Sequence, residues 1–99
     1  MNINEHLVLV AMEECAEIQQ ALSKALRFGF DDYRPSTPDE TNEDQILTEY
    51  YQLTAMIEEL QHKNILKSLT EVEVMEIKSK KINKVYKYAE YSKQRKLLE

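Results

Sequence analysis

The sequence predicts an all-α fold, an antiparallel bundle of three main helices in a single domain over residues 1–99. Gly occurs once and Pro twice in 99 residues, which leaves few places for turns. Apolar residues recur at helical spacing in three long segments, and a capping residue stands near the start of each. With 42% hydrophobic and 31% charged residues, we expect a soluble chain with a small core.

The first helix is predicted over Ile3 to Phe28, with Asn2 or Asn4 as its cap and Gly29 at its end. Residues within roughly 80° of one another on this helix form the predicted core stripe. They are Leu7, Ala11, Cys15, Ile18, Leu22 and Ala25. A thiol in a core stripe is expected to be inert.

A polar loop, Phe30 to Glu40, separates this helix from a second one that begins at Thr41 or Asn42. Asn42 and Gln45 have the spacing of a capping box. The predicted core stripe of the second helix consists of Ile46, Tyr50, Leu53, Ile57 and Leu60.

The third helix is predicted from a capping box, Thr70 with Glu73, to about Lys93. Its core stripe is Met75, Ile82, Tyr86 and Ala89. Three amphipathic helices of this length cannot close a large core alone, so we expect homo-oligomerisation to complete the bundle.

Charge and composition argue against several classes of protein. The net charge of −5 disfavours general binding to nucleic-acid polymers, although Lys78 to Lys96 is basic. The longest apolar run, Leu7 to Met12, is too short to span a membrane. A single Cys excludes an internal disulfide and agrees with a cytoplasmic protein.

Two acidic residues lie on or beside the core stripe of the first helix. Glu14 projects into it and Glu17 lies on its edge, while Glu49 lies on the matching edge of the second helix. A carboxylate among core residues costs several kcal/mol unless it is paired, protonated or bound to a cation. The spacing therefore favours a site for Mg²⁺ or Mn²⁺, with a solvated acidic face as the alternative.

The motif Glu13-Glu14-x-x-Glu17 followed by Glu49 resembles the signature of MazG-like all-α nucleoside triphosphate pyrophosphohydrolases. Their pattern is Glu-Glu-x-x-Glu, a spacer, then Glu-x-x-Asp. Two further stretches resemble small phage-type members of that family: Ser23 to Gly29 and Lys81 to Ser92.

This resemblance implies Mg²⁺-dependent hydrolysis of a (deoxy)nucleoside triphosphate to the monophosphate and pyrophosphate, by a homodimer or homotetramer. Carried over by position, Glu14, Glu17 and Glu49 are metal ligands, and Glu13 is a ligand or the base that orients water. Gln52 stands where the family has its final Asp. One negative charge is lost there, so a nucleotide-binding protein with impaired turnover is the alternative.

The phosphate contacts are expected from Lys24 and Arg27 on the first helix and from Lys81 and Lys84 on the third. Tyr88 is a candidate for stacking against the base. Ordinary surface charge, and packing for the tyrosine, are the competing interpretations of these residues.

A third hypothesis for the whole chain is a helical interaction module whose acidic face meets a basic partner. The sequence does not indicate which base is preferred.

Overall fold

The computed structural model describes all residues, Met1–Glu99, and contains three helices and no strand. They are α1 (Ile3–Phe28), α2 (Asn42–His62) and α3 (Glu71–Gln94). The predicted all-α class is confirmed, and α1 has the expected bounds. None of the three helices combines the length and the apolar composition that a membrane span requires.

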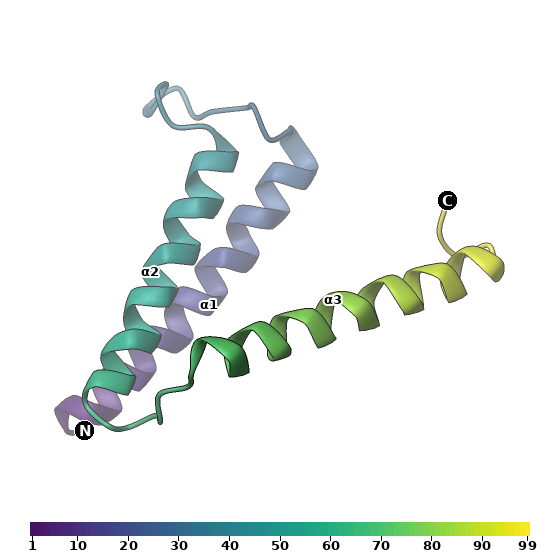
Figure 1. Ribbon diagram of the computed structural model, residues 1–99. Coiled ribbons are helices and arrows are strands. Elements are labelled where there is room, and N and C mark those ends of the chain that lie inside the picture. Colours follow the sequence, from purple (N-terminus) through teal and green to yellow (C-terminus); the bar gives the residue numbers. More distant parts are fainter. The chain divides into compact units, whose positions relative to one another are not determined.

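The chain divides into two units, Met1–Lys67 and Ser68–Glu99. In the first unit α1 and α2 pack side by side and run in opposite directions, joined by the loop of residues 29–41 (Figure 1). We call this pair the α1–α2 hairpin. The second unit consists of α3 and the C-terminal residues. A single bundle that includes α3 and a second copy stays a prediction.

Each helix begins with a side-chain cap. The Asn2 side chain accepts a hydrogen bond from the backbone N–H of Glu5, at 2.9 Å. At α3 the predicted capping box of Thr70 and Glu73 is confirmed. At α2 the predicted box was wrong by one residue, because Thr41 and Asp44 form it. Thr41 has the extended backbone of a cap, whereas Asn42 is already helical.

Asn42 instead ties the two ends of the hairpin loop together. It is buried, and its side-chain Nδ2 donates a hydrogen bond of 2.8 Å to the carbonyl of Gly29 at the end of α1. Its backbone N–H donates to the carbonyl of Asp32, and that of Glu43 donates to Phe30. These bonds use otherwise orphaned polar groups at both helix termini and set where α2 starts relative to α1.

The packed stripe of α1 is rotated from the predicted one. The residues of α1 that are buried are Ala11, Ala21 and Ala25. Cys15 and Leu22 were wrongly placed in the core, because both are exposed, Leu22 to 48%. The reason is that the stripe of α1 in contact with α2 contains its buried alanines. Short side chains let the two helices approach closely, and larger apolar residues of α1 stay outside this contact.

The same rotation occurs in α2. Leu60 is buried and Ile46 and Leu53 are half-buried, as predicted, but Tyr50 and Ile57 are exposed. Glu49 is half-buried. On α3 no residue is buried, and the predicted stripe residues Met75, Ile82 and Tyr86 are exposed.

We predict that Asn42→Ala lowers the free energy of unfolding by about 1 kcal/mol, because it removes the part-buried hydrogen bond from its side chain to the carbonyl of Gly29. Urea denaturation followed by circular dichroism measures this. Asn83→Ala, at an exposed position of α3, is the control and should change stability by less than about 0.5 kcal/mol. Equal effects of the two substitutions would contradict the role given to Asn42.

Candidate metal centre

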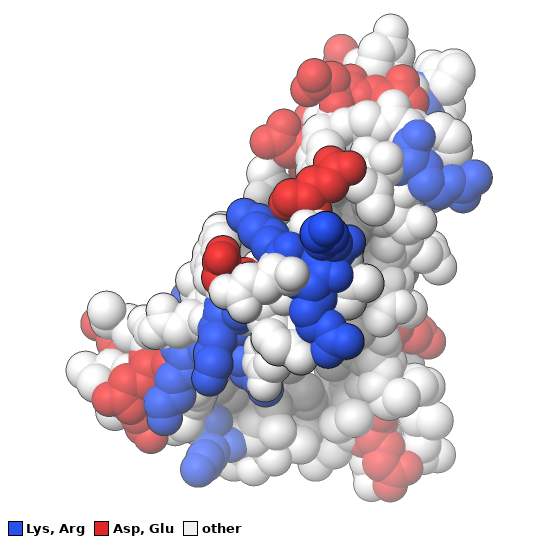
Figure 2. Space-filling view, turned by 90° about the vertical axis from the view of Figure 1, so that its right-hand side faces the viewer, with Lys and Arg blue, Asp and Glu red and all other residues white.

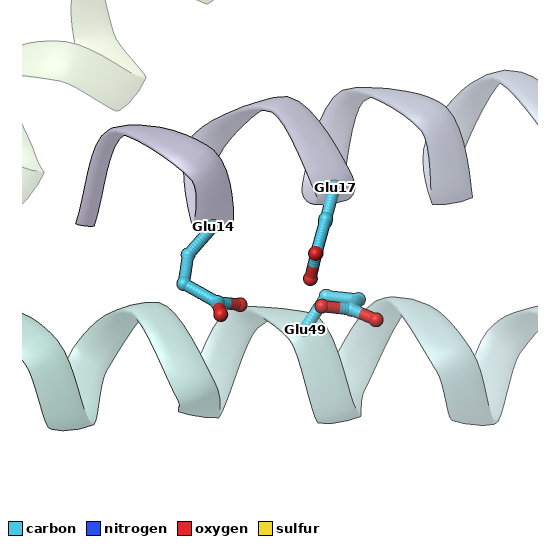
Figure 3. A group of neighbouring side chains, drawn as sticks. All are labelled: Glu14, Glu17 and Glu49. Atoms are coloured by element: carbon cyan, nitrogen blue, oxygen red, sulfur yellow. The ribbon is translucent and has the colours of Figure 1, made fainter. Parts of the chain in front are cut away.

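Three carboxylates meet between the two helices of the hairpin. Glu14 and Glu17 extend from consecutive turns of α1 toward α2, and Glu49 of α2 lies opposite them (Figure 3). One carboxylate oxygen from each lies within 4.8 Å of those from the other two. Contact between α1 and α2 therefore brings Glu14, Glu17 and Glu49 together, as expected from the sequence.

The local helix geometry explains this convergence. Glu14 and Glu17 are three residues apart, so they project from the same side of α1 one turn apart. Glu49 follows Ile46 by three residues and lies beside the packed stripe of α2. Because α1 presents alanines to α2, the helices leave room for three longer acidic side chains between them.

Two oxygen atoms of the cluster are buried without a hydrogen-bond partner, Oε2 of Glu14 and Oε2 of Glu49. A buried carboxylate oxygen with neither donor nor cation is destabilising. The cluster thus contains two buried acceptors without a donor.

The acidity of the cluster reflects this crowding. Burial raises the pKa of Glu14, and the nearby charge of Glu17 raises it further. A hydrogen bond between the carboxyls of Glu49 and Glu17 is the main cause that raises the pKa of Glu49 to about 7, followed by burial and by the charge of Glu17. Near neutral pH the cluster therefore holds a proton where a cation would relieve the same repulsion.

The donor set fits a hard divalent cation. Mg²⁺ and Mn²⁺ prefer carboxylate oxygens, and a Mg–O bond of about 2.1 Å places ligands about 3 to 4 Å apart around the ion. Oxygens that already lie within 4.8 Å of one another need only small side-chain shifts to reach that spacing. Three carboxylates leave further coordination positions for water or phosphate oxygens.

The other two residues predicted for the metal site, Glu13 and Gln52, lie outside this cluster of three carboxylates. Glu13 and Gln52 are both exposed, one residue before Glu14 and three residues after Glu49. On each helix they are rotated in the same sense, roughly 80–110° from the packed stripe. Since α1 and α2 run in opposite directions, both residues lie on the same flank of the hairpin, beside the cluster.

The predicted phosphate-binding residues occupy two different units. Lys24 is half-buried and Arg27 is exposed on α1, where they line a shallow hollow of about 340 Å³ together with Gln19, Gln20 and Ser23. Lys81, Lys84 and Tyr88 are exposed on α3. Figure 2 shows Lys and Arg side chains gathered along α3. The roles of these residues in phosphate binding stay predictions.

Comparisons of the chain with models of protein families, with curated proteins and with solved structures gave no match.

The raised pKa of Glu49 predicts the pH dependence of stability in the metal-free protein. The folded state holds a proton up to about pH 7, whereas the unfolded chain releases it near 4.5. Folding is therefore favoured by this group at low pH, and the gain is lost as the pH rises from about 4.5 to 7. Glu49→Gln should reduce this loss, and Glu58→Gln, at an exposed position of α2, should not. Thermal denaturation in EDTA between pH 5 and 8 measures the difference, and parallel curves for the two variants would contradict it.

Proposed function

We propose that the chain is a Mg²⁺-dependent nucleoside triphosphate pyrophosphohydrolase of the MazG-like type. The observation that carries the proposal is the meeting of Glu14, Glu17 and Glu49 from two helices, with two of their oxygens lacking any partner. The likeness of Glu13-Glu14-x-x-Glu17 and Glu49 to the family's motif, stated above, supports the same assignment. Mn²⁺ is an alternative metal.

The three clustered carboxylates would hold the ion, with the amide oxygen of Gln52 available on the flank. A divalent ion bound there would offset the charge of the phosphates and lower the pKa of water. Glu13, exposed beside the cluster, would orient the attacking water and accept its proton. Attack on the α-phosphorus breaks the bond to the bridging oxygen and releases the monophosphate and pyrophosphate.

Cationic side chains would position the triphosphate. Lys24 lies two turns beyond Glu17 along α1, and Arg27 lies about one turn further, so both fall on the C-terminal side of the cluster. Lys81, Lys84 and Tyr88 belong to the second unit, and the roles that the resemblance implies for them stay expectations. We assign the chain a single catalytic domain, a homodimer or homotetramer, and a place in the cytoplasm, where nucleotides are the substrate pool.

Pyrophosphate release tests the proposal. We expect release from at least one common nucleoside triphosphate in the presence of Mg²⁺ and none in EDTA. Glu14→Gln and Glu17→Gln should each lower the rate by about 10²-fold or more, because each removes a charged ligand. Glu58→Gln, the same change at an exposed position of α2, should leave it unchanged. Absence of release from every triphosphate would exclude the enzyme.

A second candidate function is binding of nucleotides without turnover. The observation in its favour is the amide of Gln52 at the position where the family has an Asp. An amide has no net charge, so it holds a cation less strongly than the carboxylate of the family's pattern. We predict that Gln52→Asp tightens Mg²⁺ binding and raises the rate of pyrophosphate release. Calorimetric titration with Mg²⁺ and the release assay measure both. Unchanged affinity and rate would mean that the residue at this position does not matter.

Thermal shift separates both functions from a helical interaction module. A metal site gives stabilisation by Mg²⁺ that grows with its concentration and disappears in Glu49→Gln. An acidic surface that serves only a basic partner gives none, and the chain then binds no nucleotide.

A further inference from the structure

The second unit, Ser68–Glu99, contains a strongly basic segment. From Lys78 to Lys96 the chain has eight basic residues and one acidic residue, Glu90. No residue of α3 is buried, and Lys and Arg side chains gather along this helix (Figure 2). The excess of acidic residues lies in the first unit. The net charge of −5 is therefore an average over an acidic first unit and a basic helix.

The lysines and tyrosines of α3 share one face of the helix. At about 100° per residue, a sector of roughly 120° contains Ile77 together with four lysines and two tyrosines. These are Lys80, Lys81, Lys84, Lys87, Tyr88 and Tyr91. Between Ile77 and Tyr91 no acidic residue lies in this sector, because Glu90 projects about 120° from its centre. We call this sector the Lys/Tyr face.

The two tyrosines place aromatic rings beside the lysines. Tyr88 is exposed to 56% and Tyr91 to 53%. Arg95 fixes the Tyr91 ring, because its Nη1 donates a hydrogen bond of 2.8 Å to the Tyr91 hydroxyl. The guanidinium carbon of Arg95 also lies 5.5 Å from the centre of that ring, in a cation–π contact. A half-exposed aromatic ring is thus held next to a positive charge.

The length of the Lys/Tyr face indicates a ligand longer than one triphosphate. Lys80 and Tyr91 are eleven residues apart, which is about 16 Å along the helix. Lysines in successive turns are about 5 to 6 Å apart, so they form a row and do not converge on one point. A stacked nucleic-acid strand has one phosphate per about 3.4 Å, so the face is as long as about four or five phosphates.

The tyrosines favour a single strand over other polyanions. Unpaired bases stack on exposed aromatic rings, whereas the bases of a duplex are covered by their neighbours. An anionic membrane fits less well, because an interfacial helix immerses an apolar side and keeps its lysines on the other. In α3, Lys78 and Lys93 project among the apolar residues opposite the Lys/Tyr face.

We propose that the Lys/Tyr face of α3 binds single-stranded nucleic acid, with its lysines on the phosphates and Tyr88 and Tyr91 against bases. Contacts of this kind hardly distinguish one base from another, so we expect little sequence preference. The site belongs to the second unit alone and needs no metal ion. It is therefore independent of the hydrolysis proposed above.

Fluorescence anisotropy of a labelled single-stranded oligo(dT) of about 20 nucleotides tests this proposal. The full chain is titrated in EDTA, where metal-dependent hydrolysis is absent. We expect binding that weakens between about 50 and 200 mM salt, with a slope of log K against log salt of about −2 to −3 for four lysines. Absence of binding at the lower salt concentration would overturn the proposal. Binding to phosphatidylserine vesicles without binding to oligo(dT) would also overturn it and assign the face to a membrane.

Paired substitutions on α3 separate the Lys/Tyr face from net charge. Lys80→Gln combined with Lys87→Gln should weaken binding by about tenfold or more at low salt and reduce the salt slope by about 1 to 1.5. Neither lysine has a role in the proposed hydrolysis, so pyrophosphate release should be unchanged. The matched control, Lys78→Gln combined with Lys93→Gln, removes the same charge from the opposite side of α3 and should weaken binding by less than about threefold. Equal losses for the two pairs would contradict a defined binding face.

Substitution of Tyr91 tests base stacking. Tyr91→Leu should weaken binding by about tenfold, because stacking of a base on the ring is lost. Tyr91→Phe keeps the ring and removes only the hydroxyl that Arg95 contacts, so it should bind nearly as well as the wild type. Circular dichroism should show the same helicity for both variants. A leucine variant that binds oligo(dT) as tightly as the wild type would rule out stacking on this residue and with it the proposed mode of binding.

Discussion

The repulsion among three carboxylates held between α1 and α2 is the constraint that the rest of the hairpin has to offset. Glu14, Glu17 and Glu49 place oxygens within 4.8 Å of one another, and two of those oxygens have no partner. Burial strengthens such repulsion, because the surroundings screen charge less than water does. The pKa of Glu49 is raised to about 7, first by a hydrogen bond with the carboxyl of Glu17 and then by burial and by the charge of Glu17.

The rest of the hairpin accommodates this unfavourable centre. Alanines of α1 let the helices approach, and Leu60 of α2 is the largest residue that becomes buried. At one end Asn42 fixes the loop by bonding to the carbonyl of Gly29. The apolar burial within one chain is therefore small. Acidic groups occupy part of the space between α1 and α2. Further burial of apolar surface elsewhere on the hairpin would therefore increase its stability.

Two sides of the hairpin differ in chemistry. One flank presents Glu13 and Gln52 beside the acidic cluster, where an ion and a triphosphate would approach. The other presents apolar residues such as Met12 and Leu26.

Helical periodicity and capping patterns in the sequence determined the three helices, the bounds of α1 and the cap at Thr70, because these depend on neighbours along the chain. The spacing also selected Glu14, Glu17 and Glu49 as one group. Only the tertiary structure decided which stripe of α1 and which stripe of α2 is packed. Periodicity gives the relative directions of side chains on one helix, but the partner helix fixes which direction becomes inward. That is why Cys15 and Tyr50 are exposed while Ala21 is buried.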